Sequence, residues 1–237
     1  MLHSNKQAYQ LRLLKLLTFI VLGSYCLTAC GQNKGAKSNS GDNELTGITM
    51  GTQVWAATNL DVVTFRNGDP IPEVKSNEEW EKAGKEGKPA WCYYENDAAK
   101  GKTYGRMYNW HAVNDARGLA PKGWHVPSNE EWIALENHVG VPVAGLRLKC
   151  DKGWMANGNG ENFNNFCIPA GGYRDRNGRF HGASEFIYIS GTTEEKDQKT
   201  NKLFIWGRGI QFENKDMMRC GLDKEFGLYV RCIKDSL

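Results

Sequence analysis

Glycine and tryptophan constrain the fold of this chain more than any other feature of its sequence. The 237 residues include 27 glycines and 8 tryptophans. Glycine is unfavourable inside helices and strands and is frequent where a chain turns, whereas each tryptophan needs a large buried surface around it. The sequence therefore predicts short elements, many turns and a core of packed aromatic side chains, and it disfavours a fold built on long helices.

The first 29 residues have the pattern of a bacterial export signal. Three basic residues precede an apolar run at 16–22, which is too short to cross a bilayer because a crossing helix takes about 20 residues. Residues 27–30, Leu-Thr-Ala-Cys, then resemble the lipobox of bacterial lipoproteins, in which the cysteine becomes the lipid-bearing first residue. We expect a lipoprotein signal peptide over 1–29 and a lipid on Cys30. The alternative is an ordinary secretory signal and a chance cysteine.

A polar segment follows the signal. Residues 31–44 contain no apolar residue except Ala36, so they cannot bury enough surface to fold. We expect 30–44 to be the lipidated cysteine and a flexible tether, and 45–237 to be one exported domain, whose length is usual for a single domain.

The charge of the mature chain excludes one class of partner. Three of the 30 basic residues and none of the 27 acidic residues lie within 1–29, which leaves 27 of each. Binding to nucleic acid depends on an excess of basic groups that a neutral domain lacks. We therefore expect a membrane as a partner through the lipid anchor, and no nucleic acid.

Five cysteines remain once Cys26 and Cys30 are set aside, and they cannot all pair. They are Cys92, Cys150, Cys167, Cys220 and Cys232. An exported protein can keep disulfides, but sequence alone does not select their connectivity. None of the five forms a C-x-x-C pair, so the sequence contains neither a zinc knuckle nor a thioredoxin-like redox motif.

The pentapeptide SNEEW occurs twice and predicts the start of two helices. Each copy, at 76–80 and at 128–132, has a serine followed three residues later by glutamate, which is the spacing of a capping box. The second copy continues with an apolar face, at Trp132, Leu135 and Val139, that ends before a glycine. The first copy is more polar, so its helix is predicted to be short and superficial.

His125 precedes the second helix cap and is interpreted as part of the scaffold. Pro127 favours an extended chain before it, which brings the flanking tryptophans together around the helix entry. No other histidine has the spacing of a metal ligand to His125. We therefore expect a buried or half-buried imidazole that hydrogen-bonds to backbone, and we assign neither a metal nor a catalytic role to it.

Most of the remaining chain has the pattern of strands. A helix is predicted through 108–113, and 194–202 is predicted to be a solvated loop. The segment 166–182 is predicted to form a hairpin with Asn177-Gly178 as a two-residue turn. The predicted strands are 53–60, 61–65, 90–95, 185–190, 203–212 and 226–233.

Several segments together resemble the Fibrobacter succinogenes major paralogous domain, a family of bacterial exported domains. The matching pieces include GTQVWAATNL, YGRMYNWHAVND, GLAPKGWHVPSNEEW and FGLYVRCIKD, and they cover about 48–235. A fainter similarity links GWHVPSNEEW and the closing YVRCIKD to the C-type-lectin-like fold of formylglycine-generating enzymes. The resemblance implies an α+β domain of twisted antiparallel sheets, short helices and long loops. It transfers no catalytic residue to this chain.

The same resemblance bears on the disulfides. Family members often have a cysteine where this chain has Ala120, and that cysteine is a natural partner for Cys232. Its absence makes Cys220 the nearest alternative partner. A second candidate is a disulfide between Cys150 and Cys167, which would close the loop between them.

The expected function is that of a binding or interaction module in the cell envelope, anchored in the outer membrane by its lipid, with a glycan or a protein as ligand. Which face of the membrane the domain occupies is open. The proposed ligand loop combines an aromatic ring with amides that could stack on and hydrogen-bond a sugar or peptide. Its residues are Trp154, Asn157, Asn159 and Asn162. The alternative is that this segment is only a turn-rich loop.

Two other functions compete with binding. One is an oxidoreductase of the formylglycine-generating type, which needs two nearby reactive cysteines, and the wide cysteine spacings argue against it. The other is a structural subunit of the envelope, which sequence does not separate from a binding protein. The prediction is therefore a domain that is not an enzyme and that needs no cofactor.

Overall fold

The computed structural model describes residues 45–236. The predictions of a signal peptide over 1–29, of a lipid on Cys30 and of a tether over 30–44 lie outside the described residues. Within 45–236, every helix is too short or too polar to cross a membrane.

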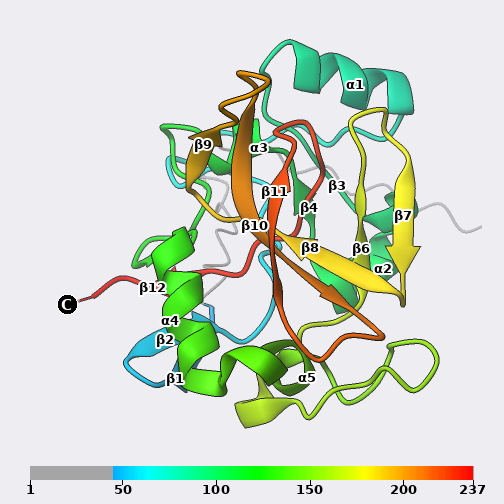
Figure 1. The fold of residues 1–237 in the computed structure, drawn as a ribbon. Coiled ribbons are helices and arrows are strands. Elements are labelled where there is room, and N and C mark those ends of the chain that lie inside the picture. The colour runs from blue at the N-terminus through cyan, green and yellow to red at the C-terminus, as the bar shows by residue number, and fades with distance from the viewer. Residues whose placement is uncertain (1–44, 237) are drawn as a thin grey trace, which may run out of the picture. The chain divides into compact units, whose positions relative to one another are not determined.

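A four-stranded sheet brings the two ends of the described chain together (Figure 1). The C-terminal strand β12 lies between β2 and β5, and Ile233 is paired with Trp55 on one side and with His125 on the other. The order β1-β2-β12-β5 is antiparallel at each junction. Its strands are β1 Gly47–Met50, β2 Gln53–Ala56, β5 Trp124–His125 and β12 Ile233–Lys234.

A larger sheet has the order β11-β10-β8-β6-β7, and β9 also pairs with β10. Its neighbours are antiparallel except β6 and β8, which are parallel. The strands are β6 Gly171–Arg174, β7 Phe180–Ala183, β8 Phe186–Ile189, β9 Glu194–Lys196, β10 Leu203–Gln211 and β11 Met218–Leu222. A separate pair is formed by β3 Trp91–Cys92 and β4 Met107–Tyr108.

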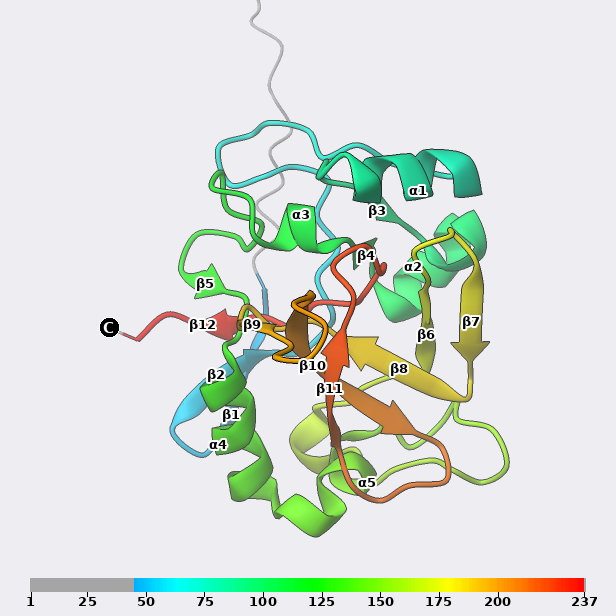
Figure 2. The ribbon, with the colours of Figure 1, turned by 45° about the horizontal axis from the view of Figure 1, so that its top comes forward.

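The helices are short, as the glycine content predicts, and they lie around the two sheets (Figure 2). The α-helices are α1 Asn77–Lys85, α2 Ala98–Tyr104, α3 Trp110–Val113, α4 Asn129–Val139 and α5 Ala144–Leu148. Single 3-10 turns occur at η1 Tyr94–Asn96, η2 Val141–Val143 and η3 Phe163–Asn165. The predicted α+β class is confirmed.

Helix α4 forms where the second SNEEW copy predicts it. The Ser128 hydroxyl accepts from the Glu131 N–H at 3.2 Å, and the Glu131 carboxylate accepts from the Ser128 N–H at 2.8 Å. The predicted apolar face of Trp132, Leu135 and Val139 is completely buried. The capping box and the amphipathic pattern therefore specify this helix locally.

Helix α1 begins at its predicted cap, where Ser76 accepts from the Glu79 N–H at 3.1 Å, but it is not superficial. Trp80 is 1% exposed. Its indole N–H donates to the Glu225 carbonyl at 3.0 Å, and the Arg174 guanidinium lies 4.5 Å from its ring centre. One buried aromatic side chain thus anchors a helix whose other residues are mostly polar.

The core consists of two clusters of buried side chains. The first contains the rings of Trp55 and Trp132, whose centroids are 4.6 Å apart, and it joins α4 to both sheets. The second contains Tyr108, Trp110 and Val230 and lies around β3, β4 and α3. Both clusters contain several tryptophans and tyrosines packed among aliphatic side chains, so the predicted aromatic packing is present.

Several predicted strands are shorter than expected. Residues 61–65 form no strand and contribute a single bridge, from Thr64 to Pro70. Residues 227–233 of the predicted strand 226–233 are buried, but a strand forms only at Ile233–Lys234. The predicted loop at 194–202 is wrong in its first part, because β9 pairs with β10. Tertiary contacts override local pattern at these places.

The β6–β7 hairpin is present, but its turn is longer than predicted. The Gly178 N–H donates to the Asp175 carbonyl at 3.0 Å, and the Asp175 N–H donates to the Arg179 carbonyl at 2.8 Å. Gly178 has φ +84°, a value that glycine adopts readily. The turn is therefore a three-residue loop closed by a glycine, and the two-residue turn is wrong.

Candidate functional site

The predicted ligand loop does not present its aromatic ring. Trp154 is 4% exposed and belongs to the first core cluster. Its indole N–H donates to the Ile168 carbonyl at 3.2 Å, and its backbone N–H donates to the Asn159 side chain at 3.0 Å. Trp154 is therefore not a stacking platform, and Asn159 holds the loop in shape.

The other two amides of that prediction occupy turn positions. Asn157 is exposed with φ 62°, and Asn162 has φ 50°. Asparagine tolerates this left-handed conformation better than most residues. The Asn162 Oδ1 atom is buried and has no partner among the described residues. The turn-rich reading therefore fits this loop, in which the bond between Trp154 and Asn159 holds the turn and presents no ring to a ligand.

The structure joins Cys150 to Cys167 with an S–S distance of 2.00 Å, at a sequence separation of 17. The pairing of Cys220 with Cys232 is wrong, because both are free thiols. Cys232 is buried beside the four-stranded sheet, and Cys220 lies on β11 opposite Gly207 in the larger sheet. Cys92 is also free.

One face of the larger sheet carries half-exposed aromatic rings instead. In antiparallel strands, directly paired residues project to the same side of a sheet. Tyr173 on β6 pairs with His181 on β7, and Tyr188 and Phe186 on β8 pair with Gly209 and Gln211 on β10. The opposite face carries Arg208 and is covered by α4.

We call Tyr173, His181, Phe186, Tyr188 and Phe226 the aromatic face. All five side chains are partly exposed. Figure 2 shows β7 and β8 on the side of the domain away from α4. Near β10 and β11 the same face of the sheet is covered by other parts of the domain, because Ile205 and Leu222 are buried in the second core cluster. The accessible part of the face therefore lies over β6, β7 and β8.

Tyr173 is the centre of the aromatic face. Its ring is stacked on His181 at a centroid distance of 5.0 Å and an interplanar angle of 23°. Phe186, Tyr188 and Phe226 contact it at 5.6, 5.1 and 5.3 Å. Such contacts stabilise ring pairs by about 0.5–1.5 kcal/mol beyond burial, so the face is a preformed surface.

A glycine on β10 makes room for the second tyrosine. A Cβ atom on Gly209 would lie 2.8 Å from the Tyr188 ring and 3.0 Å from the Cys220 sulfur. A side chain there would displace the ring. Glycine at this position lets Tyr188 lie against the strand backbone, an arrangement known for aromatic residues opposite glycine in sheets.

The two tyrosines of the aromatic face keep free hydroxyl groups. Neither the Tyr173 nor the Tyr188 hydroxyl hydrogen-bonds to any residue between 45 and 236, whereas those of Tyr108 and Tyr229 bond to backbone carbonyls at 2.8 and 2.9 Å. Partial burial raises the pKa of Tyr173 and of Tyr188. Both hydroxyls are therefore protonated at neutral pH and can donate or accept a hydrogen bond.

Charged residues border the aromatic face at the β6–β7 turn. Asp175 contacts His181, with 2.8 Å between Oδ2 and Nε2. Asp223, three residues before Phe226, forms ion pairs with Arg176 at 3.6 Å and with Lys202. The rim can thus contribute donors and acceptors beside the rings.

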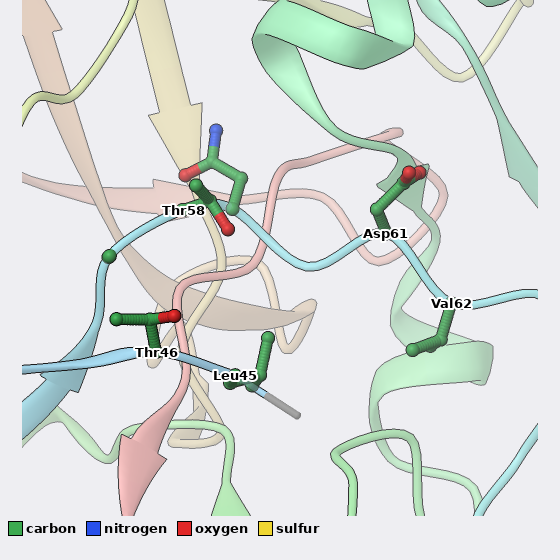
Figure 3. Close-up of a pocket in the computed structure, with 7 residues that line it drawn as sticks. Leu45, Thr46, Thr58, Asp61 and Val62 are labelled. Atoms are coloured by element: carbon green, nitrogen blue, oxygen red, sulfur yellow. The ribbon is translucent and has the colours of Figure 1, made fainter. Parts of the chain in front are cut away.

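A pocket of about 370 Å³ lies beside the start of the described chain (Figure 3). Its amide and carboxylate side chains, Asn59 and Asp61, already have partners in the protein. Asn59 donates to the Tyr104 carbonyl at 2.9 Å and accepts from Arg231 at 3.0 Å. Asp61 forms an ion pair with Arg106, and its carboxylate points away from Leu45 in Figure 3. The pocket is therefore a weaker candidate for ligand binding than the aromatic face.

His125 contacts two carboxylates instead of backbone, which corrects the predicted partner. Nδ1 lies 2.7 Å from Asp235 and Nε2 lies 2.8 Å from Glu131. The two ring nitrogens face opposite directions, so these carboxylates do not converge with the imidazole on one point where an ion could sit. The interaction joins the C-terminal segment to the cap of α4.

Comparison with known proteins identifies the family. The model of the Fibrobacter succinogenes major domain matches residues 48–234. The chain belongs to this family. The match covers both sheets and the aromatic face. No curated protein and no solved structure matches the chain.

The sequence contains one signal for the aromatic face of this Fibrobacter succinogenes major domain. In β8, aromatic residues at 186 and 188 alternate with buried isoleucines at 187 and 189. Because both sets are apolar, the alternation does not indicate which side is exposed. Only the strand registers show that Tyr173 and His181 share the side of Tyr188.

Proposed function

We propose that this protein is an exported lipoprotein of the bacterial cell envelope, anchored through Cys30 in the outer membrane, and that its domain binds a carbohydrate on the aromatic face. The anchor is supported by the basic, apolar and Leu-Thr-Ala-Cys pattern of residues 1–30. The tether over 31–44 would let the domain reach a ligand beside the membrane.

The free hydroxyl groups of Tyr173 and Tyr188 are the observation that carries the binding proposal. A sugar ring has an apolar face that packs on aromatic rings and a rim of hydroxyl groups that seek hydrogen bonds. The aromatic face offers both kinds of contact side by side, and the rings already hold one another in place. Sites of this kind combine apolar walls with a few convergent polar groups.

Two of the three free thiols, Cys92 and Cys232, argue against the rival oxidoreductase. Burial raises the pKa of Cys92 and of Cys232 to about 12. A thiol must lose its proton to act as a nucleophile or to bind a metal. Both groups therefore stay protonated and inaccessible at neutral pH, which favours a binding role.

We also propose that the domain has a C-type-lectin-like fold. Pairing of the last strand with β2 and β5, and a corner formed by GWHVPSNEEW ahead of α4, support this relationship. An experimental structure in which β12 is not inserted between β2 and β5 would argue against it.

The test of function uses a glycan array probed with the fluorescently labelled full-length protein in detergent. We expect binding to a subset of oligosaccharides and a loss of at least tenfold for Tyr173→Ala. The phenylalanine variants Tyr173→Phe and Tyr188→Phe remove only the hydroxyl groups. Each should weaken binding about five- to tenfold, the effect of one hydrogen bond, with no change in thermal unfolding.

Tyr104 provides the matched control. It is partly exposed, lies off the aromatic face beside Tyr94 and Tyr229, and its hydroxyl has no partner within 45–236. Tyr104→Phe should bind as the wild type does. Absence of binding to every oligosaccharide, or equal loss in Tyr104→Phe and Tyr173→Phe, would refute the proposal.

A further inference from the structure

Asp175 is a fixed anion at the edge of the aromatic face. Its Oδ1 atom accepts from the backbone N–H groups of Asn177 and Arg179, each at 2.9 Å. Burial alone would raise the pKa of Asp175, but the hydrogen bond from His181 and those from the backbone together outweigh burial and lower it. The group is therefore a carboxylate at neutral pH.

This carboxylate determines which nitrogen of His181 carries the proton. A carboxylate only accepts hydrogen bonds, so the His181 Nε2 atom, 2.8 Å from Asp175 Oδ2, must be the donor. In the neutral ring Nδ1 is then the unprotonated nitrogen. Nδ1 has no hydrogen-bond partner among residues 45–236, and the side chain is 39% exposed.

The ring stacking sets the plane of the imidazole that carries this nitrogen. The imidazole lies nearly parallel to the Tyr173 ring, at 23° and 5.0 Å. Two contacts therefore fix the His181 ring: the bond to Asp175 sets its tautomer and the stack on Tyr173 sets its plane. A fixed acceptor beside a ring face is a directional element that the phenol hydroxyls, which can rotate, do not supply.

We propose that His181 is the specificity-determining residue of the aromatic face: its Nδ1 atom accepts a hydrogen bond from a ligand hydroxyl while Tyr173 packs on the apolar side of the same sugar unit. This inference rests on the proposed carbohydrate binding. It adds that the ligand must offer a hydroxyl donor at this position, and that Asp175 acts through His181 as a positioning residue.

The first measurement needs no ligand. Nitrogen-15 NMR of the full-length protein in detergent reports the tautomer of each histidine. We expect the neutral ring of His181 to carry its proton on Nε2 and none on Nδ1, and Asp175→Asn to disturb this tautomer preference. A His181 ring that carries its proton on Nδ1 would overturn the inference, whatever the protein binds.

The second measurement uses defined probes, namely cellohexaose, laminarihexaose, chitohexaose and maltohexaose, with their permethylated forms, which lack hydroxyl donors. For each hexasaccharide that binds, His181→Phe keeps an aromatic ring but removes the acceptor. It should weaken binding to the free sugar about tenfold, the effect of one hydrogen bond, and it should reduce the preference for free over permethylated sugar.

His138 supplies the matched control, because it is an exposed histidine whose ring contacts Phe163 edge-on, far from the aromatic face in sequence. His138→Phe should change neither affinity nor preference. If Tyr173→Ala abolishes binding while His181→Phe binds like the wild type, the inference fails and the proposed function stands. If the wild type binds none of the four sugars and no glycan on the array, both fail together.

Discussion

The pH dependence of stability at His125 tests the interaction between the C-terminal segment and α4. The imidazole bonds to Asp235 through Nδ1 at 2.7 Å and to Glu131 through Nε2 at 2.8 Å. Both nitrogens can donate at the same time only when the ring is protonated. Glu131 also accepts from the Ser128 N–H at 2.8 Å, so the imidazolium stabilises the capping box as well.

The sign of the effect follows from the pKa of His125. Burial alone would lower it, but the hydrogen bonds and charges of Glu131 and Asp235 outweigh burial and raise it above its ordinary value of about 6.5. The folded state therefore binds the proton more tightly than the unfolded state. The resulting stabilisation is complete below the unfolded pKa and is lost as the pH rises through the folded pKa.

The expected magnitude is modest, because the His125 side chain is 38% exposed. A hydrogen bond to a charged group contributes about 1.5–3 kcal/mol where it is buried, and an exposed ion pair about 0–1 kcal/mol. Because both contacts are partly exposed to solvent, we expect His125→Gln to lower the free energy of unfolding by about 1 kcal/mol near pH 5.5. His125→Ala should lower it further, because it also removes the shape of the ring.

Urea unfolding followed by tryptophan fluorescence, near pH 5.5 and near pH 9, measures these differences. The difference in free energy of unfolding between the wild type and His125→Gln should be smaller at the higher pH. Asp235→Asn, which removes one carboxylate and keeps the helix cap, should show a smaller pH dependence of the same sign. An equal or wider gap near pH 9 would refute the assignment of a protonated bridge.

Three further predictions test the cap, the disulfide and the anchor. Ser128→Ala should lower the free energy of unfolding by about 1 kcal/mol, and Ser76→Ala by less, because only Ser128 has the reciprocal bond; equal losses in urea unfolding would contradict this. Cys167→Ser should cost about 2–4 kcal/mol by opening the 17-residue separation, and reductant should destabilise the wild type but not the variant. Cys30→Ser should yield protein without acyl chains by mass spectrometry and without partition into detergent; acyl chains on the variant would show the lipobox assignment to be wrong.

Local signals predicted the parts of the fold that depend on neighbouring residues. The spacing of Ser128 and Glu131, followed by apolar residues at helical intervals, was enough for α4. The same spacing at Ser76 located α1, but the burial of Trp80 depends on the Glu225 carbonyl, 145 residues away in the chain. No local pattern in the sequence indicates this long-range contact, so the helix was predicted to be superficial.

The candidate site was the part that local reasoning misplaced. Trp154 lies among glycines and asparagines, which is typical of an exposed loop, yet its indole bonds to Ile168 inside the core. The aromatic face, in contrast, is assembled from three strands whose pairing places Tyr173 beside His181 and Tyr188. Strand register is a tertiary property, and no single segment contains it.

Buried cations explain how a chain with so many turns keeps its backbone polar groups satisfied. Arg231 is completely buried and donates to Asn59 and to the carbonyls of four residues, and burial lowers its pKa. Lys149 donates to three carbonyls between 3.1 and 3.2 Å, and Arg174 donates to four between 2.7 and 2.9 Å.

The accepting carbonyls of these cations lie mainly in irregular segments, where neither a helix nor a sheet supplies the donors that buried carbonyls require. A planar guanidinium offers five N–H groups at once, so it can hydrogen-bond to several loop segments together. Arg174 also stacks on Trp80 and Phe180, at 4.5 and 4.8 Å from the ring centres. It thereby joins the aromatic core, α1 and the strand that carries Tyr173. Arg174, which supplies hydrogen bonds to these carbonyls, therefore also anchors the strand that places Tyr173 in the aromatic face.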